Sequence, residues 1–198
     1  MSLDNKDTFY YEHKERIDAI AAHYRAILEL LGEDTEREGL KRTPFRAAKA
    51  LVEVTQGYEQ NPSDLIRSAM FDYSGRSMVI VKDIEFYSLC EHHILPFFGK
   101  VSVGYMPEGK IVGLSKIARV VNALAKRLQV QERLTSELCE VLTATLGAKG
   151  VIVLCEAGHL CMKMRGVEKQ DSMTSTLEYS GVFVDEKLRS EFMEMLNR

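Results

Sequence analysis

The sequence lacks a long apolar run, a strong excess of one charge and a cysteine-rich framework. No uninterrupted apolar stretch approaches the roughly 18 residues of a membrane span, and residues 1–16 are polar, without the apolar segment of a secretion signal. The net charge of -3 argues against a general nucleic-acid-binding surface, although a local basic pocket remains compatible with it. Four unevenly spaced cysteines predict reduced thiols in a cytoplasmic protein, with Cys139 and Cys155 packed in the core.

The chain has 198 residues, of which 45% are hydrophobic and 28% are charged, a composition typical of a globular protein. A chain of this length can bury roughly 70% of its unfolded surface, so it needs no disulfides. We find no internal repeat and no low-complexity segment. The residue pattern is helical in the first part of the chain and includes strands in the second. We therefore predict an N-terminal helical extension over residues 1–65 and a second domain over residues 66–198.

The extension is predicted to hold a pair of helices. Apolar residues recur at helical spacing between Ile17 and Leu31, and Gly32 ends this helix. Thr43 followed by Pro44 predicts the N-cap and the first position of a second helix.

The second domain alternates strands and helices. Strands are predicted over residues 78–81, 84–87 and 99–105, and a turn at residues 107–109 leads into a strand over residues 111–114 that completes a hairpin. Two amphipathic helices follow, the first capped by Ser115 and the second ended by Gly147. Strands over residues 151–156 and 172–184 and a final helix capped by Asp185 complete the chain.

The order strand, strand, helix, helix, strand, strand predicts an α+β domain whose helices cover one face of a mainly antiparallel sheet. Such a small sheet leaves exposed edges. Closure into a multi-subunit barrel would remove them, which favours a homo-oligomer.

Two short segments carry the strongest chemical signal, namely Cys90-Glu91-His92-His93 and His159-Leu160-Cys161. Two thiolates and an imidazole suit Zn²⁺, and a three-ligand site leaves the fourth position open for water. The remaining histidines would then carry protons in hydrolytic chemistry. The alternative is a structural zinc closed by all four of Cys90, His93, His159 and Cys161, and spacing alone leaves both open.

A second group of residues suits a phosphorylated ligand. Ser115, Lys116 and Arg119 occupy the first turn of a predicted helix, where free N–H groups, a hydroxyl and two cations form an anion site. The alternative is an ordinary solvated helix face. Gln131 and Glu132 open the next helix and could bind a planar, amide-bearing heterocycle, although Glu132 could simply complement the helix dipole.

Two more cationic side chains are candidate contacts for a phosphorylated ligand. Arg165 follows closely on Cys161 and adds a positive charge near the metal loop. Arg46, in the first turn of the helix that begins at Thr43, is a further phosphate-contact candidate.

Four stretches of the chain, in this order, closely resemble GTP cyclohydrolase I: Ser88-Leu89-Cys90-Glu91-His92-His93, Gly113-Leu114-Ser115-Lys116 with Arg119, Gln129-Val130-Gln131-Glu132-Arg133-Leu134-Thr135, and His159-Leu160-Cys161 with Arg165-Gly166. The similarity extends from Thr43 to about Phe183. One mild departure is Gly158, where many members carry a β-branched residue.

The resemblance implies a tunnelling fold with a four-stranded antiparallel sheet, two helices on one face and an N-terminal helical pair. It implies a toroidal homodecamer with active sites at subunit interfaces, without nucleic-acid or membrane partners. The expected reaction converts GTP and water to formate and 7,8-dihydroneopterin triphosphate, the first step of tetrahydrofolate and pterin biosynthesis.

The resemblance also implies a role for each site residue. Cys90, His93 and Cys161 would bind zinc, while His92 and His159 would transfer protons. Glu132 with Gln131 would hold guanine, and the ribose and triphosphate would meet Ser115, Lys116, Arg119, Arg165 and Arg46. Two alternatives are a related tunnelling-fold pterin synthase, which usually binds zinc through histidines alone, and a nucleic-acid-binding zinc module.

Overall fold

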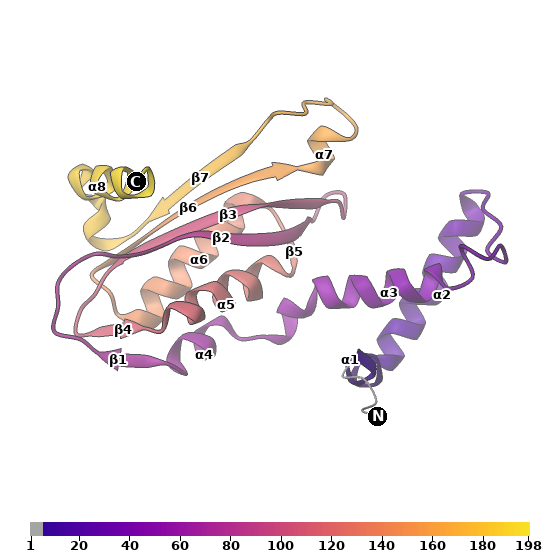
Figure 1. Cartoon of the computed structure of the whole chain (residues 1–198), viewed down its shortest axis with the longest axis horizontal. Coiled ribbons are helices and arrows are strands. Elements are labelled where there is room, and N and C mark those ends of the chain that lie inside the picture. The colour runs from indigo at the N-terminus through magenta and orange to yellow at the C-terminus, as the bar shows by residue number, and fades with distance from the viewer. Residues whose placement is uncertain (1–5) are drawn as a thin grey trace. The chain divides into compact units, whose positions relative to one another are not determined.

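A computed structural model describes residues 6–198, with side chains from Thr8 onward. The described chain forms two compact units, one ending at Thr55 and the other running from Gln56 to Arg198. Figure 1 labels their helices and strands. We describe each unit by itself.

The N-terminal unit is helical. It contains α1 (Lys6–Glu12), α2 (Lys14–Leu30) and α3 (Thr43–Val54). The predicted pair corresponds to α2 and α3, and α1 precedes them. These helices bury Ile17, Ala48 and Val52 between them. The expected cap is wrong in detail, because Arg42 occupies the N-cap position and the Thr43 hydroxyl instead donates to the Gly39 carbonyl oxygen at 3.2 Å.

The second unit is built on a five-stranded sheet. Its strands, in the spatial order β5-β2-β3-β6-β7, are β5 (Leu128–Gln129), β2 (Val79–Cys90), β3 (Pro96–Met106), β6 (Gly150–His159) and β7 (Thr174–Tyr179). Every pairing is antiparallel except that of β5 with β2. The prediction of an α+β domain with a mainly antiparallel sheet is therefore confirmed. The expected count of four strands is wrong, because the two-residue β5 adds a fifth strand beside β2.

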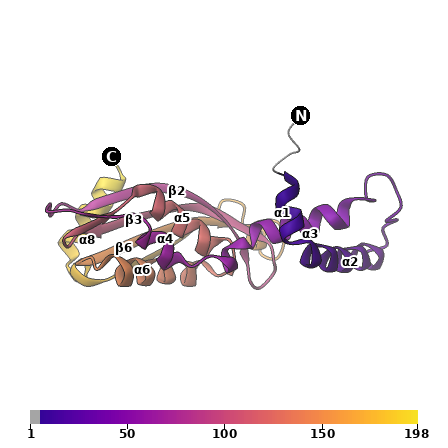
Figure 2. The ribbon, with the colours of Figure 1, turned by 90° about the horizontal axis from the view of Figure 1, so that it is seen from below.

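Two helices cover one face of this sheet, as Figures 1 and 2 show: α5 (Leu114–Ala125) and α6 (Gln131–Leu146). Alternation along β6 sends Val151, Val153 and Cys155 into the core beneath these helices. The intervening Ile152 faces the other side and packs with Phe192 of α8 (Glu186–Leu196). The last helix therefore covers part of the second face, so the expectation that the helices cover a single face needs this correction.

The predicted hairpin after residue 109 is wrong. Strand β4 (Lys110–Val112) pairs with β1 (Met70–Asp72) in a separate two-stranded sheet, and not with the strand that precedes the turn. The Val112 N–H lies 3.4 Å from the Tyr105 hydroxyl, so the chain folds back over the end of β3 without extending its ladder. The pairing with β1 connects positions about forty residues apart, which local turn signals do not report.

Short helical segments complete the second unit. The 3₁₀ turn η1 (Gln56–Glu59) contacts α5, and α4 (Pro62–Arg67) packs on both α5 and α6. Helix α7 (Leu160–Lys163) follows β6 directly. The strand predicted over residues 172–184 ends earlier, because β7 stops at Tyr179 and η2 (Gly181–Val184) follows it. No helix among residues 6–198 is long and apolar enough to cross a membrane.

Candidate active site

Three predicted metal ligands come together at one end of the sheet. Cys90 is the last residue of β2, His93 lies in the turn after it, and Cys161 lies in α7. Their ligand atoms all lie within 4.8 Å of one another, and the Cys90 Sγ is 3.9 Å from the His93 Nδ1. Two soft sulfur ligands and one imidazole at these separations fit a tetrahedral zinc ion with one open position.

The backbone holds the Cys90–His93 turn tightly. The Cys90 N–H donates to the Leu95 carbonyl at 2.9 Å, and the Cys90 carbonyl accepts from Ile94 at 2.8 Å. Ile94 has a φ of 54°, a left-handed conformation that is costly for a β-branched residue. The turn is therefore constrained, which fixes the directions in which Cys90 and His93 project.

His159 lies apart from the three-residue metal group. Its ring stacks on Phe97 at a centroid distance of 4.8 Å and an interplanar angle of 2°, and its Nε2 lies 2.8 Å from the Gln131 Oε1. Burial lowers the pKa of His159, while the nearby Glu132 carboxylate opposes that shift. This arrangement supports the three-ligand alternative over the closed four-ligand zinc, because the His159 Nε2 already has Gln131 as its partner and the gathered ligand group consists of Cys90, His93 and Cys161.

Gln131 is committed to contacts inside the protein. It is 1% exposed, and its amide nitrogen lies 3.0 Å from the Cys155 carbonyl and 2.9 Å from the Thr174 carbonyl. With the amide oxygen on His159, both ends of this side chain are occupied. The sequence predicts that Gln131 helps to hold a base and gives no indication of its contact with His159. Glutamine at the start of a helix carries no signal that could have revealed it.

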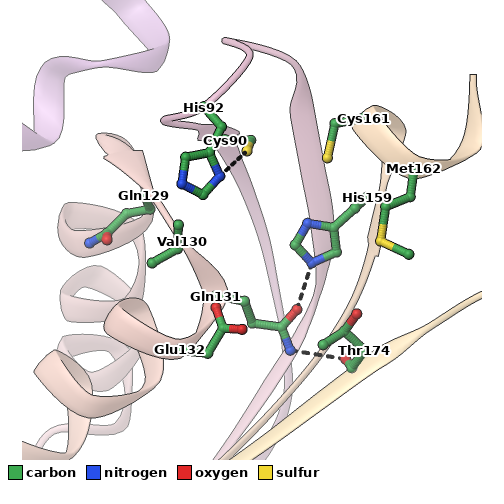
Figure 3. Close-up of a pocket in the computed structure, with 10 residues that line it drawn as sticks. All are labelled: Cys90, His92, Gln129, Val130, Gln131, Glu132, His159, Cys161, Met162 and Thr174. Carbon is green, nitrogen blue, oxygen red and sulfur yellow. Dashed lines mark hydrogen bonds between the residues drawn. The ribbon is translucent and has the colours of Figure 1, made fainter. Parts of the chain in front are cut away.

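A cavity of about 200 Å³ opens beside the metal group. Figure 3 shows the sulfur atoms of Cys90 and Cys161 at one end of this cavity and Glu132 toward the other. The exposed Glu132 carboxylate remains available to a ligand. Some of the residues that line the cavity have no predicted role from the sequence, namely Gln129, Val130, Met162 and Thr174.

The predicted phosphate contacts are distributed differently. Arg165 lies at the metal group, with its Nη1 3.3 Å from the His93 Nε2. Ser115, Lys116 and Arg119 line no part of the cavity that holds Glu132 and His159. They lie at the start of α5, whose other end leads into β5, and a twelve-residue helix spans about 18 Å.

The structure corrects the predicted cap of α5 and places Arg46 in the N-terminal unit. Gly113 is the N-cap of α5, so the prediction that Ser115 caps the helix is wrong. Arg46 belongs to the N-terminal unit, where its Nη2 donates to the Gly39 carbonyl at 3.2 Å. Its contact with a phosphate remains a prediction.

A recessed cavity with convergent polar groups on an α+β domain is the arrangement of a small-molecule enzyme. Comparison with known proteins gives the family. The family model described as GTP cyclohydrolase I matches residues 20–197. This chain therefore belongs to the GTP cyclohydrolase I family and is an enzyme of that family.

Individual relatives agree over nearly the whole chain. A protein named GTP cyclohydrolase 1 from Porphyromonas gingivalis is 52% identical over 187 residues, which cover 94% of this chain and 97% of the relative. The protein of that name from Parabacteroides distasonis is 54% identical over 182 residues, covering 90% and 92%. The solved apo structure of the archaeosine synthase QueF-Like aligns with 55% of this chain and 97% of that one, at 19% identity and a TM-score of 0.41, a similarity too low to bear on function.

Proposed function

We propose that this protein hydrolyses GTP at C8 of the purine and rearranges it to 7,8-dihydroneopterin triphosphate with release of formate. The observation that carries the proposal is the Cys90, His93 and Cys161 group at the edge of a cavity that also holds His159 and Glu132. Family membership supports the same reaction, since the matching relatives are named GTP cyclohydrolase 1.

Cys90, His93 and Cys161 would hold zinc in this proposal. Zinc bound there would activate water as a nucleophile near neutral pH. A pterin-synthase site with histidine ligands alone fits less well, because two of the three gathered ligands are cysteines.

The two other histidines would handle protons. His159 is held by Gln131 on one side and stacked on Phe97, so its position in the cavity is fixed before substrate arrives. A fixed imidazole can protonate the purine imidazole ring and make C8 electrophilic. His92 lies at the cavity but is largely exposed, which suits proton exchange during ring opening and the later rearrangement of the ribose.

Glu132 would bind the guanine. Its carboxylate can accept hydrogen bonds from adjacent N–H groups of the base, and it opens α6 at the cavity wall. Gln131 would act on the base only indirectly, by orienting His159, because its own amide is already satisfied within the protein.

The triphosphate would be bound across a subunit boundary. Ser115, Lys116 and Arg119 lie at the far end of α5 from the β5 connection, so a second copy of the chain would bring its own set to this cavity. This supports the tunnelling-fold homodecamer that the sequence resemblance implies, with Arg165 and Arg46 as further phosphate contacts. The outer edges of β5 and β7 are the sheet edges at which copies could join.

The test is incubation of the zinc-loaded protein with GTP. We expect formate and, after mild oxidation, fluorescent neopterin phosphate in equal amounts. Zinc content is measured in the same sample, so that an empty site cannot be mistaken for inactivity. A protein with full zinc that yields neither product would contradict the proposal.

A further inference from the structure

A bidentate ion pair joins the metal-binding turn to the helix that carries Glu132. The Arg133 Nη1 lies 2.6 Å from the Glu91 Oε2, and the Arg133 Nη2 lies 3.0 Å from the Glu91 Oε1. Paired N–H···O bonds of this kind fix orientation as well as distance. The two residues are 42 positions apart in the sequence, so the pair is a tertiary tie.

Both partners of this ion pair lie next to residues of the candidate active site. Glu91 lies between the metal-ligand candidates Cys90 and His93 and next to His92, and Arg133 follows Glu132 directly. The backbone also connects the turn to β5, the strand that leads into α6, because the Glu91 N–H donates to the Gln129 carbonyl at 3.0 Å. The backbone hydrogen bond fixes the position of Glu91 relative to Gln129, and the ion pair with Arg133 fixes the orientation of the turn relative to α6.

The charged surroundings favour the pair without competing with it. Arg133 donates two hydrogen bonds to the Glu91 carboxylate, and the Glu91 side chain is 31% exposed. The other ionisable groups close to the pair are His92, whose Nε2 lies 3.9 Å from the Glu91 Oε1, and Glu137, which lies near Arg133. Apart from His92 and Arg133, no cationic side chain lies within salt-bridge distance of Glu91 among the described residues.

We propose that Arg133 is a positioning residue, which uses its ion pair with Glu91 to set the distance between the metal group and the base-binding Glu132. This inference rests on the proposed function for its catalytic consequence, although the effect on metal retention stands by itself. In the described part of the chain, Arg133 makes no hydrogen bond or ion pair with any of the three metal-ligand candidates. It acts on the turn that presents them.

Exposed ion pairs often contribute little to stability, so a global stability change is the wrong measure. The informative quantities are kcat, the KM for GTP and the rate of zinc release. If the ion pair sets geometry, its loss impairs the transition state more than ground-state binding of GTP, because the proposed phosphate contacts Ser115, Lys116 and Arg119 lie outside this cavity.

The experiment compares Arg133→Gln, Glu91→Gln, Arg133→Lys and the charge exchange of Glu91→Arg with Arg133→Glu. For either Gln variant we expect kcat to fall about 10-fold and zinc release to a chromogenic chelator to accelerate about 10-fold, the lower end for groups that orient metal ligands, with KM changed less than about 3-fold. Arg133→Lys keeps the charge but loses the paired geometry, so its values should be intermediate. The exchange should recover most of the loss.

The matched control is Lys100→Gln. It breaks the exposed Lys100–Asp83 pair, 3.3 Å between β3 and β2, which is away from the cavity. We expect wild-type kcat and zinc release from this variant, and its failure to show them would overturn the proposal.

Three further results would overturn the proposal. They are wild-type zinc release and kcat in Arg133→Gln, a raised KM with unchanged kcat, which would make Arg133 a substrate contact, and no recovery in the charge exchange. If the wild-type protein makes no product from GTP, the proposed function fails, while the zinc-release comparison still supports or overturns the tie.

Discussion

At the scale of single residues, the two histidines outside the metal group carry the sharpest expectation. We expect His92→Ala and His159→Ala each to retain zinc and to lose about 10²- to 10⁴-fold in turnover, the range for a positioned general acid or base. Zinc analysis and single-turnover formate release would show whether the two variants stop at different steps. His23→Ala, which removes an exposed histidine of α2, is the control. Full activity in either variant would contradict its assigned role.

The four cysteines should differ in reactivity according to burial. Cys155 is fully buried, and desolvation raises its pKa to about 12; burial likewise raises the pKa of Cys139. Alkylation requires the thiolate, so a raised pKa keeps both thiols protonated and unreactive well above pH 8. We expect iodoacetamide at pH 8 to leave Cys139 and Cys155 unmodified in the folded protein and to modify both in urea. Mass spectrometry of quenched samples reads this directly, and rapid native labelling of Cys155 would contradict it.

The residue types of the metal group could be predicted from the sequence because chemistry restricts them. Few residues other than cysteine and histidine suit zinc, and Cys90, His93 and Cys161 do converge. The role of Gln131 could not be predicted in the same way. An amide can meet a base or a neighbouring side chain equally well, and only the packing of Cys155 and Thr174 around it decides.

At the scale of elements, Gly99 of β3 leaves no room for a side chain against the paired strand β6. A methyl group added there would lie 1.9 Å from the Glu156 carbonyl oxygen and 2.7 Å from the Ala157 Cα, both in the paired strand β6. Backbone atoms in the middle of a sheet cannot retreat, so Gly99→Ala should destabilise the fold by at least about 3 kcal/mol. Gly39→Ala, whose new methyl would meet only the tip of Arg37 at 3.4 Å, is the control.

The readout for Gly99→Ala is the thermal midpoint together with soluble yield at fixed protein concentration. We expect a large loss for Gly99→Ala and a small change for Gly39→Ala. Equal midpoints for the two variants would show that β3 and β6 are less closely paired than the structure has them.

Elements with a strong local pattern were the predictable ones. Gly147 ends α6 at a φ of 61°, and the Asp185 side chain accepts from the Lys187 N–H to cap α8, both as the sequence indicates. The pairing of β4 with β1 was not predictable, since a turn signal reports only that the chain reverses. Which strand it then meets depends on the whole domain.

At the scale of the whole molecule, the proposed function implies a site shared between copies of the chain. The metal group and Glu132 share one cavity, while Ser115, Lys116 and Arg119 line no part of it. Mixing two inactive variants therefore tests whether the site is shared between subunits. A Lys116→Ala protein and a Glu132→Ala protein, each inactive alone, should regain part of the activity after dissociation and reassembly together, because some cavities would then combine intact residues from two copies. No recovery in mixed assemblies would contradict a site shared between subunits.

Removal of the metal should separate activity from folding. The core beneath α5 and α6 is continuous and largely apolar, with Val101, Leu138 and Val153 fully buried, and Cys90 lies among its buried residues. A chain of this size buries enough surface to fold without a metal, unlike a zinc finger, whose folding depends on the ion. A chelator should therefore abolish product formation and leave the far-UV circular dichroism spectrum unchanged. Added zinc should restore turnover without a refolding step, and Cys161→Ala should resemble the chelated protein in both respects. Unfolding on chelation would mean that the metal holds the end of the sheet together, and undiminished turnover would mean that the reaction proceeds without it.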